Sequence, residues 1–297
     1  MNITGLVKVG GVKFSNPLMN GAYINSKTID DAKVLASSAA GAIVIGSISV
    51  KPRKKNSGQN YWLHKEQFFS LNSYGLPNGG IKYYKDALPE IVKIAHSHGK
   101  PLIANLVGFS NAEFGELISL AEKSGADIAE LNFGCPNVWD EGYQKRIVSY
   151  HASLVKETLD FIKKQKPKIK ISVKISPLPP DILREVAKVI AGSGIVQIIT
   201  ATNSYPNAAI TSGAKKATSN QDVLAGLAGR ALKPISLGVV KQLRQLLPKQ
   251  IDIIGCGGIS SVNDVKDFLE AEAKAIQIAT ALNEEGPTIF EKIISSS

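Results

Sequence analysis

The chain has 297 residues, a formal net charge of +10 at pH 7, two cysteines and four histidines. It contains no apolar run of about 18 residues, which excludes a transmembrane helix, and its amino terminus lacks the layout of a signal peptide. Two cysteines are too few for a disulfide framework, and the histidines show no zinc spacing. We therefore expect a cytoplasmic protein with no metal site and no membrane partner.

The positive charge is spread along the chain, and its densest run lies at residues 51–55. No aromatic residues alternate with this run, as they do in platforms that bind single-stranded nucleic acid. A solvated basic surface, or one that attracts anionic ligands, is favoured over nucleic-acid binding. His96 and His98 precede Gly99 and are interpreted as a solvated helix end.

Short apolar stretches alternate with amphipathic ones along most of the chain. Residues 5–14 come first, and their two short strands around a Gly-Gly turn predict a hairpin that caps the floor of a barrel. Strands are then expected at 17–19, 42–46, 101–107, 128–131, 170–175, 196–200, 251–255 and 275–279. Helices are expected at 28–38, 80–97, 110–124, 150–165, 179–194, 235–247, 260–270 and 285–295. Long loop insertions are expected at 47–77 and 201–229, and a polar loop at 136–149.

Strands that each precede a helix imply parallel pairing. In a chain of this length, eight such units predict an α/β fold, a closed (β/α)8 TIM barrel, as one domain over residues 1–297. The alternative is a doubly wound open sheet. A barrel binds its ligands at the carboxyl ends of its strands, so the residues at those ends are the candidates for function.

Residues 129–137 begin as a strand and end as a loop, with Cys135 between the carboxamides of Asn132 and Asn137. This thiol is interpreted as a nucleophile, a general base or a buried structural group. No histidine is expected beside it, which disfavours a Cys–His nucleophile, whereas a base needs only a lowered pKa and a cover over the site. Cys256, among glycines, is interpreted as structural.

Carboxamides gather at the expected strand ends and in the first insertion. An amide both donates and accepts hydrogen bonds, so a set of amides suits a ring that alternates C=O and N–H groups, such as a pyrimidine. Each asparagine taken alone is more often an ordinary turn residue. The set consists of Asn72, Asn132, Asn137, Asn203 and the hydroxyl of Ser204.

Two further features indicate an anionic cofactor. Gly257 and Gly258 lead from a strand into a helix, and with Ala279 and Thr280 they match the phosphate site that many barrels build after their last two strands. Lys174 ends another strand, where its ammonium would stabilise a reduced flavin. The alternatives are a glycine-rich packing turn and a lysine that reaches solvent. The sequence has no Walker motif and no dinucleotide fingerprint.

These residues together resemble dihydroorotate dehydrogenase, the FMN-dependent barrel enzyme of pyrimidine biosynthesis, and are most similar to its soluble class 1 members. The resemblance spans nearly the whole chain and includes an Asn-Ser-x-Gly-Leu-Pro-Asn loop and an Asn-x-x-Cys-Pro-Asn stretch. The matching motifs lie at 16–20, 72–78, 130–138, 173–174, 203–204, 232–234, 253–259 and 277–282.

The resemblance implies a role for each matching residue. Cys135 removes the C5 proton of dihydroorotate while C6 gives a hydride to the flavin, and cysteine in this position is typical of class 1. The residues implied to bind the substrate are Asn72, Tyr74, Gly75, Leu76, Asn132, Asn137, Asn203 and Ser204. Those implied to bind FMN are Gly21, Ala22, Gly46, Ser47, Asn105, Asn132, Lys174, Thr200, Gly229, Gly257, Gly258, Ala279 and Thr280.

The chain departs from the class 1 pattern at three places. Class 1 members carry a lysine after the second strand, where this chain has Gly46, and we hypothesise that Lys27 substitutes for it. Ala279 replaces a glycine. The expected lid, residues 137–150, differs from that of the fumarate-using form, so the electron acceptor stays open between fumarate, NAD through a partner subunit, and another compound.

The resemblance also implies a homodimer, alone or with an iron–sulfur flavoprotein subunit that passes electrons to NAD. Two other functions stay open. One is flavin-linked chemistry on another pyrimidine or cyclic amide, as in dihydropyrimidine dehydrogenase. The other is a barrel that binds a phosphorylated ligand without turnover.

Overall fold

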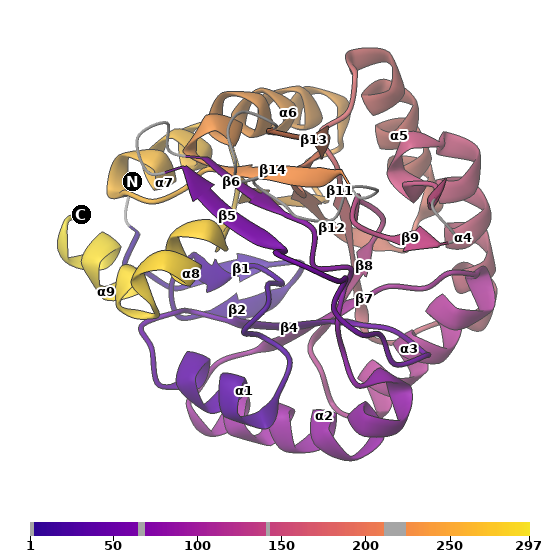
Figure 1. The fold of residues 1–297 in the computed structure, drawn as a ribbon, viewed down its shortest axis with the longest axis horizontal. Helices are drawn as coiled ribbons and strands as arrows, with labels where there is room; N and C mark the ends of the chain where they lie inside the picture. Colours follow the sequence, from indigo (N-terminus) through magenta and orange to yellow (C-terminus); the bar gives the residue numbers. More distant parts are fainter. Residues whose placement is uncertain (1–2, 65–68, 141–142, 211–223) are drawn as a thin grey trace.

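The computed structural model describes residues 3–64, 69–140, 143–210 and 224–297. Within these residues, eight parallel strands form one sheet that curls into a barrel (Figure 1). Their order is β3 (Leu18–Asn20), β16 (Ala275–Ile278), β15 (Asp252–Cys256), β12 (Val196–Ala201), β11 (Lys170–Ile175), β8 (Ile128–Asn132), β7 (Leu102–Leu106) and β4 (Ile43–Ile48). The predicted (β/α)8 barrel is confirmed, and the doubly wound open sheet is excluded.

The seam between β3 and β4 is joined partly by a side chain. One parallel bridge links Met19 to Ala42. The fully buried carboxamide of Asn20 donates from Nδ2 to the carbonyl oxygen of Val44 at 2.6 Å and accepts at Oδ1 from the Val44 N–H at 2.9 Å. Buried backbone groups must be paired, so the Asn20 side chain takes the place of a backbone partner that the short strand β3 does not supply.

Helices surround the barrel and pack their apolar faces against the strands. In the described ranges they are α1 (Ile29–Ala36), α2 (Gly80–Ser97), α3 (Asn111–Lys123), α4 (Ala152–Gln165), α5 (Pro180–Ser193), α6 (Lys233–Leu246), α7 (Val262–Glu270), α8 (Thr280–Glu285) and α9 (Thr288–Ser295), with 3-10 turns η1 (Val148–Tyr150) and η2 (Arg230–Leu232). None of these helices is long and apolar enough to cross a membrane.

Local sequence signals explain where these helices begin and end. Helix α1 begins with a capping box, in which Thr28 Oγ1 accepts from the Asp31 N–H at 3.1 Å and Asp31 Oδ2 accepts from the Thr28 N–H at 2.9 Å. The helix expected at 285–295 is present as α9, which begins later, at Thr288, and a further short helix, α8, precedes it. Gly286, with a φ of 73°, and Pro287 separate α8 from α9, because proline has no N–H to continue a helix.

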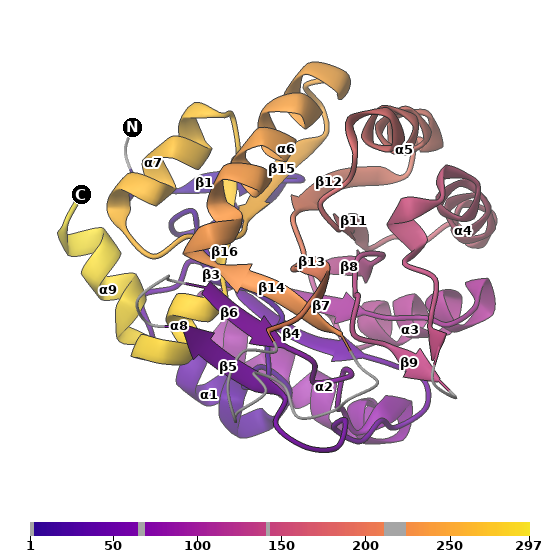
Figure 2. The ribbon, with the colours of Figure 1, turned by 45° about the horizontal axis from the view of Figure 1, so that its top comes forward.

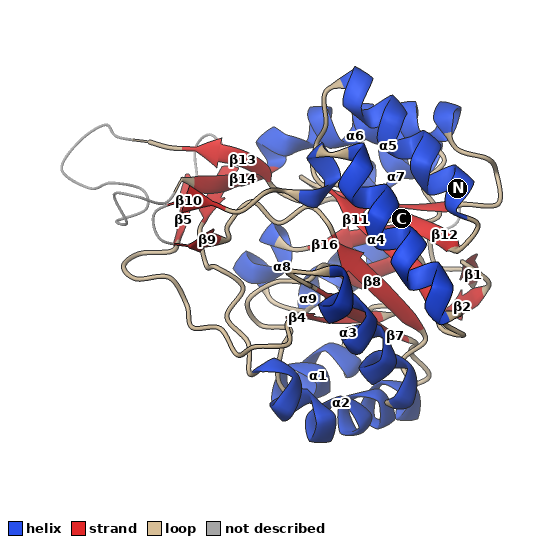
Figure 3. Cartoon of the chain, turned by 90° about the vertical axis from the view of Figure 1, so that its right-hand side faces the viewer, coloured by secondary structure: helices blue, strands red, loops and turns tan. Residues whose placement is uncertain are grey.

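The amino-terminal hairpin closes one end of the barrel. Its strands β1 (Val7–Val9) and β2 (Val12–Phe14) pair antiparallel and lie at the end opposite the strand carboxyl ends (Figure 3). Val9 and Phe14 are fully buried, and Gly10 N donates to Asp252 Oδ2 at 2.8 Å. The buried residues packed with them inside the barrel are Met19, Ala42, Val44, Ile103, Ile128, Ile198, Ile254 and Ala275. The predicted floor cap is confirmed.

The two long insertions contain a second sheet, which the sequence did not predict. Strands β5 (Tyr61–His64), β6 (Phe69–Asn72), β13 (Tyr205–Ala208) and β14 (Ala225–Gly229) pair antiparallel in the order β13-β14-β6-β5. The sheet lies across the mouth of the barrel (Figure 2). Its central pairing joins Asn72 to Gly226, 154 positions away, so short-range patterns could not reveal it. Residues 65–68 and 211–223 of the insertions lie outside the described residues.

The loop after β8 also departs from the expected polar loop. It folds back as a small antiparallel hairpin of β9 (Trp139–Asp140) and β10 (Tyr143–Gln144), and the Lys145 N–H donates to the Val138 carbonyl oxygen at 2.8 Å. Residues 141–142 of this loop lie outside the described residues. The hairpin stands beside the second sheet at the same end of the barrel (Figure 3).

Candidate active site

A cavity of about 380 Å³ lies at the carboxyl ends of the barrel strands, beneath the second sheet. Most residues predicted from the sequence line it, although they come from segments far apart in the chain. These residues are Ala22, Gly46, Ser47, Asn72, Tyr74, Gly75, Leu76, Asn132, Cys135, Asn137, Lys174, Asn203, Ser204, Gly229, Gly257, Gly258, Ala279 and Thr280.

Three predicted residues do not line the cavity. Asn105 and Thr200 are fully buried one layer below it, where Asn105 Nδ2 and Thr200 Oγ1 donate to the carboxylate of Glu130 at 2.7 and 2.6 Å. Gly21 lies behind Ala279, and its N–H donates to the carbonyl oxygen of Ile278 at 2.8 Å. The sequence placed these three residues at strand ends, but the register of the barrel strands sets them below or behind the cavity wall.

The predicted carboxamides form two hydrogen-bonded groups in the cavity wall. Asn203 Nδ2 donates to Asn132 Oδ1 at 3.1 Å, and Asn132 Nδ2 donates to Ser47 Oγ at 3.1 Å. Asn137 Nδ2 donates to Asn72 Oδ1 at 2.6 Å. Within the described residues, the buried Oδ1 of Asn137 has no hydrogen-bond partner. A buried acceptor without a partner is costly, so this atom is suited to receive a donor from a ligand.

Cys135 faces the cavity from the loop that follows β8. Burial raises the pKa of its thiol to about 11, although a backbone hydrogen bond from Asn137 and the charges of Lys27, Arg53 and Lys174 oppose the rise. On the sequence alone, a base here needs a lowered pKa, whereas the pKa of Cys135 shifts in the opposite direction. The sequence showed no charged neighbour for Cys135, and it also could not show how closely protein atoms surround the thiol, which disfavours the thiolate.

Two buried residues, Gln277 in the cavity wall and Glu130 below it, were missed as functional candidates. Lys174 Nζ donates to Gln277 Oε1 at 2.8 Å, and Gln277 Nε2 donates to Glu130 Oε2 at 2.8 Å. Glu130 and Gln277 both belong to the sequence motifs but received no role. A signal was available, because each is a polar residue within an otherwise apolar strand, and a buried polar residue needs a partner.

A glycine turn after β15 forms the opposite wall. Gly257 has a φ of 126° and Gly258 a φ of 75°, and a Cβ at Gly258 would lie 2.6 Å from the backbone nitrogen of Lys233. Only glycine fits such a position, so backbone forms the cavity surface there. These positions match the anion site that the sequence predicted after the last two strands.

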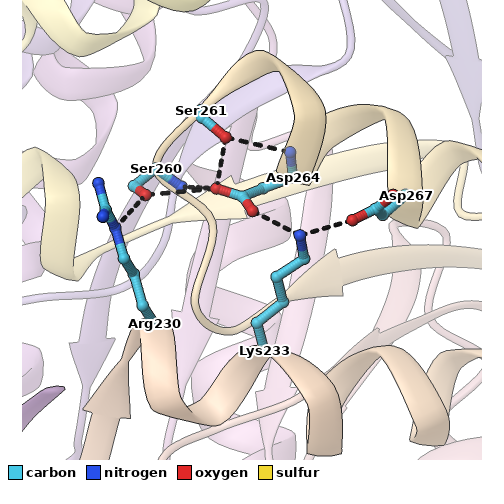
Figure 4. Close-up of polar contacts among 6 residues, drawn as sticks. All are labelled: Arg230, Lys233, Ser260, Ser261, Asp264 and Asp267. Carbon is cyan, nitrogen blue, oxygen red and sulfur yellow. Dashed lines mark hydrogen bonds and ion pairs between the residues drawn. The ribbon is translucent and has the colours of Figure 1, made fainter. Parts of the chain in front are cut away.

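A polar cluster braces this turn, and two of its members, Arg230 and Ser260, also line the cavity (Figure 4). Lys233 Nζ contacts Asp264 Oδ1 and Asp267 Oδ2, both at 2.5 Å, and so joins α6 to α7. The Ser260 N–H donates to Asp264 Oδ2 at 3.0 Å, and Arg230 Nε donates to Ser260 Oγ at 2.9 Å. The cluster ties the turn to both helices and thereby limits its movement.

A model of the dihydroorotate dehydrogenase family matches residues 6–296 of the chain. The chain belongs to this family. Dihydroorotate dehydrogenase A (fumarate) of Lactococcus lactis subsp. cremoris (strain MG1363) is 31% identical over 287 residues, which cover 95% of this chain and 89% of that protein. A putative dihydroorotate dehydrogenase A (fumarate) of Streptococcus agalactiae serotype Ia is 29% identical over 289 residues, covering 96% and 90%. The predicted class 1 membership is confirmed.

A solved structure shows the same fold. The crystal structure of DHODH in complex with ferulenol from Eimeria tenella superposes with a TM-score of 0.81 at 18% identity, covering 98% of this chain and 82% of that one. At this identity the likeness establishes a common barrel.

This family member has no room for a side chain at Gly46. A Cβ there would lie 2.3 Å from the carbonyl oxygen of Asn105, at a φ of 132°. Lys27 reaches the same cavity from the segment between β3 and α1. Burial lowers the pKa of Lys27 to about 8, and electrostatic interaction with Asp31 and with the thiolate form of Cys135 opposes that shift. Lys27 is therefore close enough to Cys135 to interact with it electrostatically.

The mouth of the cavity contains a further contact that the sequence did not predict. Tyr61 Oη, on β5, donates to Glu284 Oε1, on α8, at 2.6 Å, and its ring stacks on Tyr74 at 6.2 Å. Burial raises the pKa of Tyr61 above its ordinary value, which keeps the phenol a donor. The contact ties the second sheet to the barrel, and no local pattern joins residues so far apart.

Proposed function

We propose that this chain binds FMN in the cavity and oxidises dihydroorotate to orotate in pyrimidine biosynthesis, with Cys135 as the base. The observation that carries the proposal is the Oδ1 of Asn137, which has no hydrogen-bond partner among the described residues and lies in the same wall as the Cys135 thiol. A dihydropyrimidine ring carries N–H groups at N1 and N3, each separated by one carbon atom from C5, the carbon that must lose a proton. An acceptor and a base in one wall therefore match both demands of the substrate.

The residues present fit FMN. The turn at Gly257 and Gly258 offers backbone where a phosphate is expected, and glycine is required there by the closeness of Lys233. Lys174 donates to Gln277 and lines the cavity, so its other ammonium hydrogens are available to a ring carbonyl. When bound, FMN supplies the acceptor for the hydride that leaves C6 of the substrate.

The chain's own residues orient the substrate and take the proton. Asn132 and Asn203 already bond to each other, which holds their remaining polar atoms in fixed directions toward the ring. The Sγ of Cys135 accepts the proton from C5. The nearby charges of Lys27, Arg53 and Lys174 favour the thiolate that does so. Because the pKa is raised, the thiolate is scarce at neutral pH but strongly basic once formed.

Residues 137–150 are proposed as the lid that excludes water from this reaction. Their first half contains the β9–β10 hairpin, which stands over the same end of the barrel as the cavity. A lid that excludes water would strengthen the interaction between the Lys174 ammonium and a ligand, because the effective dielectric constant falls.

Lys27 is proposed to take the place of the lysine that Gly46 cannot provide. Its charge acts on Cys135, so Lys27→Ala is expected to slow flavin reduction by dihydroorotate and to shift its pH dependence upward. Lys27→Arg keeps the charge and is expected to retain more of the rate. Unchanged flavin binding and turnover in Lys27→Ala would end the idea.

The decisive experiment is anaerobic titration of the purified protein with dihydroorotate. The protein is expected to be yellow and to bleach as its flavin is reduced. A colourless protein that takes up no added FMN would contradict the flavin assignment. Bleaching by dihydrouracil at the same rate as by dihydroorotate would favour action on another cyclic amide, since dihydrouracil lacks the carboxylate.

Assembly and electron acceptor extend the proposal. We propose a cytoplasmic homodimer that reduces either fumarate directly or NAD through an iron–sulfur partner subunit. Sedimentation of the purified chain tests the dimer. Turnover of the isolated chain with fumarate, and no turnover with NAD, would exclude the need for a partner subunit.

A further inference from the structure

Below the cavity, a layer of buried polar side chains fills the barrel. Glu130 is fully buried and accepts three hydrogen bonds, from Asn105 at 2.7 Å, Thr200 at 2.6 Å and Gln277 at 2.8 Å. Four strands, β7, β8, β12 and β16, contribute to this arrangement. A carboxylate inside a barrel is costly unless it is fully hydrogen-bonded, so its presence requires an explanation.

The carboxylate connects to the cavity through a single carboxamide. Gln277 Nε2 faces Glu130, and Gln277 Oε1 accepts from Lys174 Nζ at 2.8 Å. A flipped amide would set its NH₂ against the ammonium and its oxygen against the carboxylate. Only one orientation of Gln277 therefore satisfies both neighbours.

The Lys174 charge is consequently only partly compensated. Among the described residues, no carboxylate forms an ion pair with Lys174, which is 4% exposed and lines the cavity. The nearest negative charge along the hydrogen-bond chain is Glu130, one carboxamide away. Water screens charges only weakly at this depth, so removing or moving the Glu130 charge would change the electrostatic potential at the cavity wall.

We propose that Gln277 and Glu130 are positioning residues that aim the Lys174 ammonium into the cavity and set the reduction potential of the flavin bound against it. This rests on the proposed function, since it requires that FMN occupies the cavity. The negative charge of Glu130 offsets part of the positive charge that stabilises the reduced flavin. Gln277 keeps the ammonium from being drawn down to Glu130.

Two substitutions are expected to move the potential in opposite directions. Glu130→Gln removes the offsetting charge, so the reduced flavin binds about tenfold more tightly relative to the oxidised form, which raises the potential by about 30 mV. Gln277→Met removes the spacer while keeping a similar volume. The ammonium then moves toward Glu130 and the potential falls. A general loosening of the buried layer would not shift the flavin potential up in one variant and down in the other.

The test measures the midpoint potential of bound flavin and the affinity of the apo-protein for oxidised FMN. Ser172→Ala is the matched control. Ser172 lies in the same buried layer and contacts Thr200 at 3.4 Å, but it does not belong to the hydrogen-bond chain from Glu130 through Gln277 to Lys174. This variant is expected to leave the potential unchanged. Oxidised FMN is expected to bind Glu130→Gln as it binds the wild type, since the oxidised ring carries no added charge.

Two results would overturn the proposal. One is a wild-type flavin potential in folded Glu130→Gln or folded Gln277→Met, and the other is a potential shift of equal size in Ser172→Ala. If Glu130→Gln does not fold, the fall expected for Gln277→Met still decides. A wild-type protein without flavin would contradict the proposed function itself. A flavin-loaded wild type with unshifted variants would contradict only the roles of Gln277 and Glu130.

Discussion

At its floor the barrel is filled by apolar side chains, whereas two residues further along the same strands the inward positions are polar. On β8, Ile128 packs in the floor cluster, and Glu130 is hydrogen-bonded in the layer above. On β16, Ala275 belongs to the floor and Gln277 to the polar layer. Alternate residues of a strand point to the same side, so one short strand supplies both layers.

This difference indicates that the floor of the barrel mainly stabilises the fold, whereas the mouth carries the groups suited to ligand binding. Among the described residues, the floor cluster consists of apolar side chains, and the β1–β2 hairpin closes it. The mouth keeps unpartnered and partly paired polar atoms, which cost folding free energy and are suited to a ligand. Floor substitutions should therefore change unfolding and mouth substitutions should change flavin reduction.

The largest effect is expected from removing the proposed base. Cys135→Ser should slow anaerobic flavin reduction by dihydroorotate near neutral pH by about 10²–10⁴-fold, because a hydroxyl is a far poorer base than a thiolate. Stopped-flow absorbance of the flavin measures the rate, with FMN content and thermal unfolding as controls. Unchanged reduction kinetics would remove Cys135 from the mechanism.

At the floor, Phe14→Ala should lower the free energy of unfolding by about 3–5 kcal/mol, because Phe14 is fully buried and its loss leaves a cavity. Urea denaturation measures this, and Phe14→Leu, which fills more of the space, should cost less. The affinity for FMN and the reduction rate of the folded fraction should stay at the wild-type level. A parallel loss of FMN affinity would break the separation between floor and mouth.

The seam offers an intermediate case. Asn20→Ala should destabilise the fold by about 1–3 kcal/mol, since the buried N–H and C=O of Val44 lose their partner. Asn263→Ala, at an exposed position of α7, is the matched control and should leave stability unchanged. Equal stability of both variants in urea would show that the Asn20 carboxamide does not close the seam.

The smallest expected effect is the change of the flavin reduction rate with pH. The pKa of Cys135 is raised to about 11, so below pH 8 the thiolate fraction and the flavin reduction rate should rise about tenfold per pH unit. Above pH 8, Lys27, with its pKa lowered to about 8, loses the charge that favours the thiolate, and the rise should flatten. A rate that stays flat between pH 6 and 8 would contradict the raised thiol pKa.

Local patterns predicted the barrel and most of the cavity wall. Apolar strands, the Thr28 capping box and the glycines at 257–258 are readable because each acts over a few residues. The second sheet and the Glu130–Gln277 contact were missed because their partners lie 154 and 147 positions apart. The raised pKa of Cys135 could not be predicted, because the burial of the thiol depends on atoms that the whole fold brings around it.

The sequence by itself determined the repeat of strand and helix, the family, and the cysteine, lysine and carboxamides at the strand ends. These follow from periodicity and residue chemistry, which are local. Only the tertiary structure decided that Gly46 has no room for a side chain, that Lys27 lies near enough to interact electrostatically with Cys135, and that Lys174 donates a hydrogen bond to a carboxamide. Those outcomes depend on strand register and packing distance, which emerge when the barrel closes.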